Sequence, residues 1–232
     1  MYIIALIPLY IILPFIINII FSTLGNFFNI NIKYIFNIKE TVIIYDFIIN
    51  IIIITVFFWL KDKIIEDFKS SIIFVKKHWL SLTIFFVIIK LLVLFLELIL
   101  ELFNSSFNLN DTENQIQVIN WIMSDTPLLS TIIIFLSITV IGPIFEEIMF
   151  RHIIIRELGN IFSYKFMAIA SIISFSYIHI ISSKNMYEII VYLILSLPLV
   201  YFYFKSNFNI FIPIYFHIMV NLTSYIYIVI YN

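Results

Sequence analysis

The chain has 232 residues, of which 63% are hydrophobic and only 12% are charged, compared with about 25% charged residues in a typical soluble domain. Its mean hydropathy of +1.12 excludes an ordinary soluble protein and indicates an integral membrane protein. The net charge of −1 points to no class of partner, and the absence of cysteine excludes disulfides and thiolate chemistry. We expect one membrane domain over residues 1–232, lying in the lipid bilayer and without a nucleic-acid partner.

Seven apolar runs that can cross a bilayer follow one another along the chain. Each is expected to be an α-helix, because backbone groups in hydrocarbon need internal partners and a β-barrel would show short alternating segments. The first run has no preceding basic region and no clear cleavage site, so we interpret it as a span rather than a signal peptide. The predicted spans are residues 2–21, 41–60, 80–100, 128–150, 163–181, 187–204 and 210–231. The predicted fold is therefore an all-α polytopic bundle of about seven transmembrane helices.

Lysine and arginine are unevenly distributed between the two sides of this predicted topology. Nine lie on one side, five of them within residues 61–78, and three lie on the other side. Because cytoplasmic loops are enriched in these residues, we predict a multi-pass cell-membrane protein with a cytoplasmic N-terminus and an external C-terminus. Residues 61–79 are typical either of a helix lying on the inner leaflet or of a solvated connector. Residues 101–127 are predicted to form an external loop that is partly re-entrant near residues 116–123.

Few ionisable residues interrupt the spans, and each is a candidate functional residue because a charge in the bilayer costs at least about 2.5–3.5 kcal/mol. They are Asp46, Lys90, Glu97, Glu146, Glu147, Arg151, His179, Glu188 and His217. Lys90 and Glu97 are seven residues apart on one helix face, which favours a packing pair or side chains that reach opposite interfaces. With Asp46 and Glu188 they also suggest a small transporter, the least favoured alternative.

The sequence GPIFEEIMFR at residues 142–151 contains two adjacent glutamates that we expect to differ in function. Glu147 and Arg151 are four residues apart on one helix, so an ion pair can keep both charged in a dry environment. Glu146 points about 100° away from Glu147 and lacks that partner, which makes it the candidate general base. Gly142 and Pro143 lie one turn earlier and predict a kink that admits water or substrate.

Two later predicted spans each carry a histidine, and in each span the other end of a short motif lies one helical turn from that histidine. The sequence FSYIH ends at His179, and HIMVN places His217 and Asn221 on one helix face. The second pair can hold a developing oxyanion, or His217 can bind a metal. Each motif alone is equally consistent with hydrogen bonds between helices. Together with Glu146 they supply the groups that activate water and stabilise a tetrahedral intermediate.

The three motifs resemble those of the CPBP intramembrane proteases, which include the CAAX prenyl endopeptidases and the Abi proteins of bacteriocin processing and self-immunity. EEIMFR matches the EExxxR motif, FSYIH matches FxxxH and HIMVN matches HxxxN, in the expected order. The resemblance covers about residues 115–225, the expected catalytic core. Two features depart from the family: His152 stands where glycine usually follows the motif arginine, and we predict seven spans where eight are often described.

The resemblance implies that Glu146 and His179 activate the attacking water, that His217 and Asn221 form the oxyanion site, and that the predicted ion pair supports this geometry. Family members are described both as metal-dependent and as metal-free glutamate-type proteases. Zinc bound by Glu146, His179 and His217 is therefore one alternative and a metal-free site is the other.

The predicted function is that of an intramembrane endopeptidase, which hydrolyses a peptide bond of a membrane-associated protein or peptide. A non-proteolytic membrane immunity or signalling protein on the same scaffold is the main alternative. Specificity for prenylated CAAX peptides is not implied, because many bacterial relatives have no such substrate.

Overall fold

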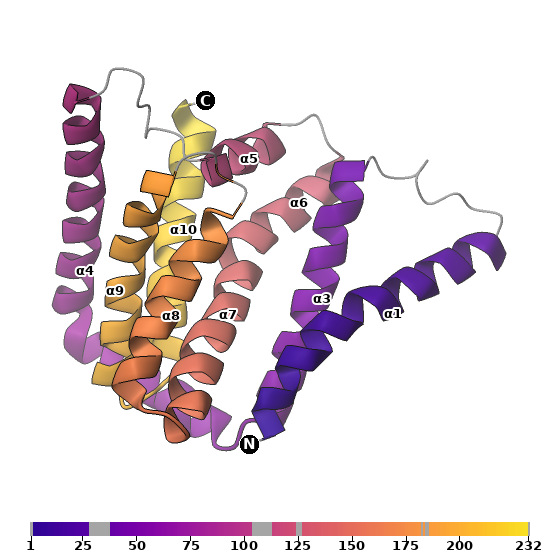
Figure 1. Ribbon diagram of the computed structural model, residues 1–232, viewed down its shortest axis with the longest axis horizontal. Helices are drawn as coiled ribbons and strands as arrows, with labels where there is room; N and C mark the ends of the chain where they lie inside the picture. Colours follow the sequence, from indigo (N-terminus) through magenta and orange to yellow (C-terminus); the bar gives the residue numbers. More distant parts are fainter. Residues whose placement is uncertain are drawn as a thin grey trace.

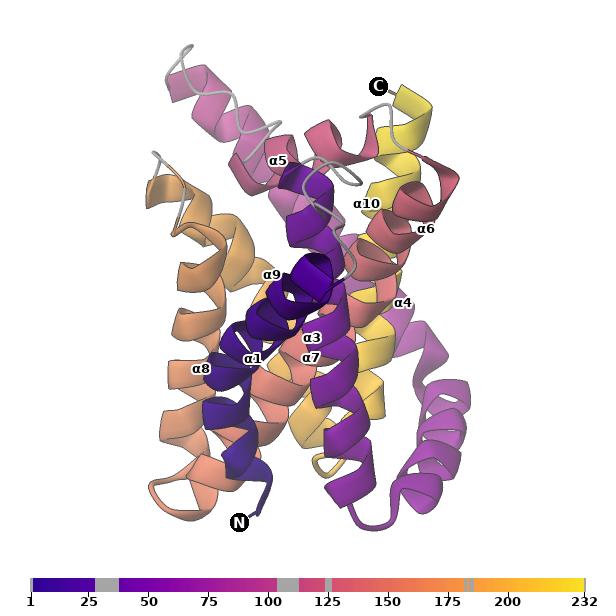
Figure 2. The same ribbon diagram turned by 90° about the vertical axis from the view of Figure 1, so that its right-hand side faces the viewer.

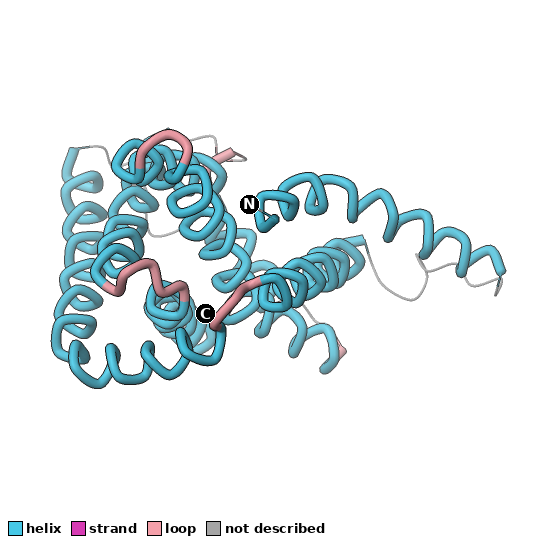
Figure 3. Tube along the Cα trace, turned by 90° about the horizontal axis from the view of Figure 1, so that it is seen from below, coloured by secondary structure: helices cyan, strands magenta, loops and turns pink. Residues whose placement is uncertain are grey.

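The computed structural model describes residues 2–27, 38–103, 113–123, 127–181, 183 and 186–231, and all regular structure in these ranges is helical (Figures 1 and 3). The predicted all-α membrane bundle is thereby confirmed. Five of the described helices are long and apolar enough to cross a membrane, so the number of seven spans stays a prediction. In Figure 1 the N-terminus lies at the lower end of the bundle and the C-terminus at the upper end.

The first two predicted spans form one side of the bundle. A short 3₁₀ turn, η1 (Tyr2–Ala5), leads into α1 (Leu6–Phe27), and α3 covers Ile38–Leu60. The first half of α1 packs against the bundle through buried leucines and isoleucines, and the rest of the helix extends away from it (Figures 1 and 3). The early part of α1 therefore belongs to the packed bundle.

A single helix of 40 residues, α4 (Ile64–Phe103), contains both the charged segment 61–79, from its fourth residue onward, and the predicted span 80–100. No glycine or proline occurs between its ends, so nothing in the backbone separates the two parts. Its first turns run obliquely across the lower end of the bundle before the helix turns upward (Figures 1 and 2). In this first part Ile65 and Phe68 are exposed among the lysines. The short helix α5 (Glu113–Ile122) lies at the upper end, where a loop was predicted.

The predicted span 128–150 is too short, because the helix continues to Asn160. It comprises α6 (Leu128–Leu136), the π-helical η2 (Ser137–Ile141), α7 (Gly142–Glu147), the π-helical η3 (Ile148–Glu157) and the 3₁₀ turn η4 (Leu158–Asn160). The hydropathy criterion ended the span at the first arginine, yet that arginine, Arg151, is completely buried. The two π segments flank the glutamate pair, and such segments are frequent at functional sites.

The helices at the last three predicted spans have the predicted bounds to within a few residues. They are α8 (Tyr164–His179), α9 (Ile189–Lys205), which follows the 3₁₀ turn η5 (Met186–Glu188), and α10 (Phe211–Tyr231). Of these, α9 and α10 are long and apolar enough to cross a membrane. The Ser163 side chain accepts a hydrogen bond from the backbone N–H of Phe166 and so caps the start of α8. Helix α8 packs against both α9 and η3.

Two clusters of buried apolar side chains hold the helices together, and η3 contributes to both. One cluster joins η3 to α1, α3 and α9 through residues such as Ile53, Phe57 and Ile153. The other joins it to α4, α8, α9 and α10 through residues such as Phe150 and Phe202. Because lipid is as apolar as these side chains, close packing rather than hydrophobicity selects these contacts. The helix that carries the glutamates therefore lies between two packed layers.

Candidate active site

The ion pair predicted within the EEIMFR motif is present and lies in the interior of the bundle. The Arg151 Nε atom is 3.2 Å from Oε2 of Glu147, and both side chains are fully buried. Neither Oε2 of Glu147 nor any guanidinium nitrogen has a well-aligned hydrogen bond within the described residues. The guanidinium instead lies over the ring of Phe175, with 4.4 Å from Cζ to the ring centroid. Charge attraction and this cation–π contact therefore offset part of the cost of burial.

Glu147 has a second partner that was not predicted. Its Oε1 atom is 2.8 Å from Nδ1 of His217, which belongs to α10. Since a charged carboxylate can only accept hydrogen bonds, Nδ1 of His217 carries a hydrogen and donates it. The Nε2 atom of His217 is thereby directed to the opposite side of the ring, away from the ion pair.

Glu146 lies between two imidazole rings that come from different helices. Its Oε2 atom is 3.7 Å from Nε2 of His179 on α8 and 3.7 Å from Nε2 of His217 on α10. This oxygen is buried and has no hydrogen-bond partner among the described residues, although a quarter of the whole side chain is exposed. A separation of 3.7 Å is too long for a direct hydrogen bond and is the kind of gap that a water molecule bridges.

His179 is oriented by contacts on two sides. Its Nδ1 atom lies 2.7 Å from the carbonyl oxygen of Phe175, and because a carbonyl only accepts, Nδ1 carries the hydrogen. The Tyr192 ring stacks on the imidazole at 4.6 Å with 26° between the planes. In the tautomer that donates from Nδ1, the unprotonated Nε2 faces Glu146.

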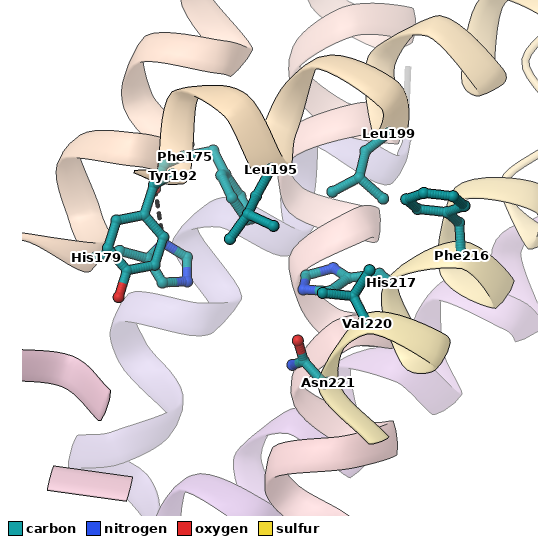
Figure 4. A pocket seen from close by; sticks show the side chains of 9 residues that line it. All are labelled: Phe175, His179, Tyr192, Leu195, Leu199, Phe216, His217, Val220 and Asn221. Carbon is teal, nitrogen blue, oxygen red and sulfur yellow. Dashed lines mark hydrogen bonds between the residues drawn. The ribbon is translucent and has the colours of Figure 1, made fainter. Parts of the chain in front are cut away.

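A cavity of about 100 Å³ lies between α8, α9 and α10, beside these groups (Figure 4). His217 and Asn221 project into it from α10 and His179 from α8, and Leu195, Leu199 and Phe216 form much of its apolar wall. The amide nitrogen of Asn221 donates to the backbone carbonyl of Ile138 at 3.0 Å. One of the two amide hydrogens of Asn221 is thus engaged outside the cavity.

The residues do not form a ready metal centre. Within the described part of the chain, no group of three His, Asp or Glu side chains has the arrangement of a metal site. Zinc bound by Glu146, His179 and His217 therefore stays a prediction.

The structure brings five of the six predicted site residues into one network of contacts, and the sixth, Asn221, lies beside them in the cavity wall. The ring of Phe175 contacts Arg151, and its carbonyl contacts His179, so this residue joins the two ends of the network. In the sequence, Phe175 is recognisable only as the first residue of the FxxxH motif, and no pattern points to Tyr192. The departure at His152 lies away from these groups, since its Nδ1 is 3.3 Å from the Tyr203 hydroxyl and its ring packs on Phe57.

A comparison with known protein families finds a match over the segment that contains this network. Residues 128–223 match the model of a family described as type II CAAX prenyl endopeptidase Rce1-like. Comparisons with curated proteins and with solved structures found no match. The matched segment contains every residue of the network. Residues 128–223 are therefore similar to the Rce1-like type II CAAX prenyl endopeptidases, in agreement with the resemblance of the three motifs to the CPBP intramembrane proteases.

Proposed function

We propose that this chain is an intramembrane endopeptidase that hydrolyses a peptide bond of a membrane-associated protein or peptide with an activated water. One observation carries the proposal. The Oε2 atom of Glu146, which has no hydrogen-bond partner in the described part of the chain, lies 3.7 Å from Nε2 of both His179 and His217, next to a cavity. The match to the Rce1-like family model supports a protease, and the role of each residue is proposed from the geometry.

The attacking water lies in the gap between Glu146 and His179. Oε2 of Glu146 and Nε2 of the neutral His179 ring are both acceptors, so a water between them donates one hydrogen to each and directs its lone pairs elsewhere. When the oxygen attacks a carbonyl carbon, Glu146 accepts the proton as general base. His179 keeps the water in line for attack.

The oxyanion of the tetrahedral intermediate is held by His217 and Asn221, which project into the cavity from the same side (Figure 4). His217 donates from Nδ1 to Glu147, and when Nε2 also carries a hydrogen it donates from Nε2 to the developing oxyanion. The second amide hydrogen of Asn221 remains for the same oxygen. Donors fixed in this way before the reaction need little reorganisation when charge develops.

Glu147 and Arg151 support the reaction without contacting the substrate. Glu147 fixes the orientation of the His217 ring, and Arg151 balances the charge of Glu147 in the fully buried interior. The apolar wall of Leu195, Leu199 and Phe216 suits an apolar stretch of substrate that lies in or next to the bilayer.

The test is hydrolysis by the purified protein in lipid vesicles, using a library of lipid-anchored peptides in water enriched in oxygen-18. A protease incorporates the label into the new C-terminal carboxylate. Glu146→Gln removes the base and is expected to lower the rate by at least about 10²-fold. Asp46→Asn is the matched control, since Asp46 is an exposed carboxylate within a span and has no assigned role. Equal rates for the native chain and Glu146→Gln would overturn the proposal.

The non-proteolytic alternative makes the opposite prediction. An immunity or signalling protein that only sequesters a partner keeps its effect in cells after Glu146→Gln and His179→Ala. Lys90 is one of the residues that suggested a transporter. It donates a hydrogen bond to Ser224 on α10 at 2.9 Å, so a structural role accounts for its place in the span.

A further inference from the structure

The helix that carries the glutamates has a backbone carbonyl without a backbone donor. The N–H of Gly142 donates to the carbonyl of Ser137, five residues earlier, in the π-helical register of η2. The next donor in this register would be residue 143, paired with the carbonyl of Ile138. Residue 143 is a proline and has no N–H. The Ile138 carbonyl is thus left without its backbone partner inside a membrane span, where an unpaired group is costly.

A side chain from another helix supplies the missing donor. The Asn221 amide nitrogen lies 3.0 Å from the Ile138 oxygen, although the two residues are 83 positions apart. We propose that Asn221 substitutes for the N–H that Pro143 lacks, and that through this bond it positions Glu146 relative to His217. Asn221 is thus a positioning residue as well as a candidate oxyanion donor; only the consequence for catalysis rests on the proposed function.

The bond can position the site because it is one of two connections between the same two helices. Asn221 lies one turn beyond His217 on α10, and their partners Ile138 and Glu147 lie nine residues apart on the other helix. A single contact would leave α10 free to rotate about its axis or slide, whereas two separate contacts restrict both motions. The distances from Glu146 to the two imidazoles depend on that rotation. Losing the Asn221 bond therefore changes the geometry of the water site without removing any group from it.

The close approach of Gly142 keeps the π turn in this register. A Cβ atom on residue 142 would lie 2.7 Å from the Ser137 carbonyl oxygen, and the Oε1 of Glu146 would be 3.9 Å from it. The Gly-Pro pair therefore creates both the space beside Glu146 and the unpaired carbonyl. Asn221 provides a donor for the unpaired carbonyl and leaves the space beside Glu146 unchanged.

A double-mutant cycle tests the substitution directly, because Pro143→Ala restores the N–H. We expect Asn221→Ala to raise the unfolding equilibrium constant about tenfold in the native background, the effect of one unmade buried hydrogen bond. In the Pro143→Ala background the same change should have about a twofold effect or less, because the restored N–H serves the Ile138 carbonyl. Equal losses of stability in both backgrounds would overturn the proposal. Thr223→Val is the control, since within the described part of the chain the Thr223 hydroxyl bonds only to carbonyls of α10, and the change should have the same effect in both backgrounds.

Two further measurements separate positioning from stability and from the proposed function. Asn221→Ala should lower kcat more than it changes KM, and adding Pro143→Ala should restore part of kcat. Recovered stability with no recovery of kcat would overturn the positioning role. Hydrogen exchange of residues 138–145 tests the bond without any hydrolysis: in the double variant the new N–H of residue 143 should exchange slowly. Rapid exchange at that amide would overturn the substitution even if the chain proved not to be a protease.

Discussion

The Nδ1 atom of His217 lies 2.8 Å from Oε1 of Glu147, a carboxylate that no solvent reaches. The same carboxylate carries the ion pair with Arg151, so one glutamate joins a catalytic candidate on α10 to a buried positive charge on η3. The two adjacent glutamates therefore have different surroundings. Oε1 of Glu147 contacts His217, while Oε2 of Glu146 lies between the rings of His179 and His217.

Removing the charge of Glu147 should affect both stability and rate. Glu147→Gln leaves Arg151 buried without a counter-charge, which costs about 3–5 kcal/mol in the free energy of unfolding. It also loosens the His217 ring, and a misplacement of about 1 Å lowers kcat by about 10²-fold. Unfolding in detergent and hydrolysis in vesicles measure the two effects. In the double variant Glu147→Gln with Arg151→Met, we expect stability to recover and kcat to stay low. Recovery of kcat would mean that Glu147 acts only as a counter-charge.

Removing the charge of Glu146 should instead stabilise the fold. No described protein group donates a hydrogen bond to its buried Oε2, and a charged carboxylate in such a place is costlier to bury than a neutral amide. Glu146→Gln replaces the charge by a neutral amide that can donate to an imidazole nitrogen. We expect a higher midpoint of thermal unfolding in detergent, together with the loss of hydrolysis. Asp46→Asn, at an exposed position, should leave the midpoint unchanged. A lower midpoint for Glu146→Gln would show that this carboxylate holds helices together.

A methyl group on residue 142 should disturb the turn in front of the glutamates. In Gly142→Ala the new Cβ would lie 2.7 Å from the backbone oxygen of Ser137, which has no freedom to move aside. We expect a loss of about 1–3 kcal/mol in the free energy of unfolding, as for other overpacked sites. Val140→Ala, a smaller side chain in the same π turn, is the comparison and should have the weaker effect. If both variants unfolded at the same denaturant concentration, the close approach would be unimportant.

Hydrolysis should persist after metal is removed. The described residues include no three-ligand group with the arrangement of a metal site, and the proposed water activation needs only Glu146 and His179. We therefore expect less than one equivalent of zinc in elemental analysis of active protein, and an unchanged rate after dialysis against a chelator. Stoichiometric zinc, with activity lost to the chelator and restored by zinc, would assign the site to the metalloprotease class instead.

The predicted orientation can be measured by labelling introduced cysteines, because the chain has none of its own. Lys69 at the start of α4 and Met186 at the start of η5 are both exposed. A cytoplasmic N-terminus places them on opposite sides of the membrane. A membrane-impermeant thiol reagent should label Met186→Cys on intact cells and Lys69→Cys only in inverted vesicles. The reverse pattern would show an external N-terminus.

The predicted helix boundaries are correct where hydropathy alone determines them, and wrong where a contact with a neighbouring side chain determines them. Residues 187–204 and 210–231 correspond closely to α9 and α10, because a long apolar run in a bilayer must be helical. The span that begins at residue 128 was ended ten residues too early. Hydropathy counts the charge of Arg151 but not the carboxylate and the ring that make its burial possible. A hydropathy pattern scores each residue separately, so it cannot include the side chains that contact that residue.

The sequence by itself determined the membrane class, the helices and the Glu147–Arg151 pair, since an ion pair four residues apart depends only on helix geometry. It also determined which groups are available for chemistry. Only the tertiary structure decided that His217 donates to Glu147, that Glu146 lies between two imidazoles and that Asn221 serves the carbonyl left by Pro143. The partners in two of these contacts are 70 and 83 residues apart. Their meeting depends on how each helix is rotated about its axis, and in lipid that rotation is set by packing between helices rather than by an apolar pattern along any one of them.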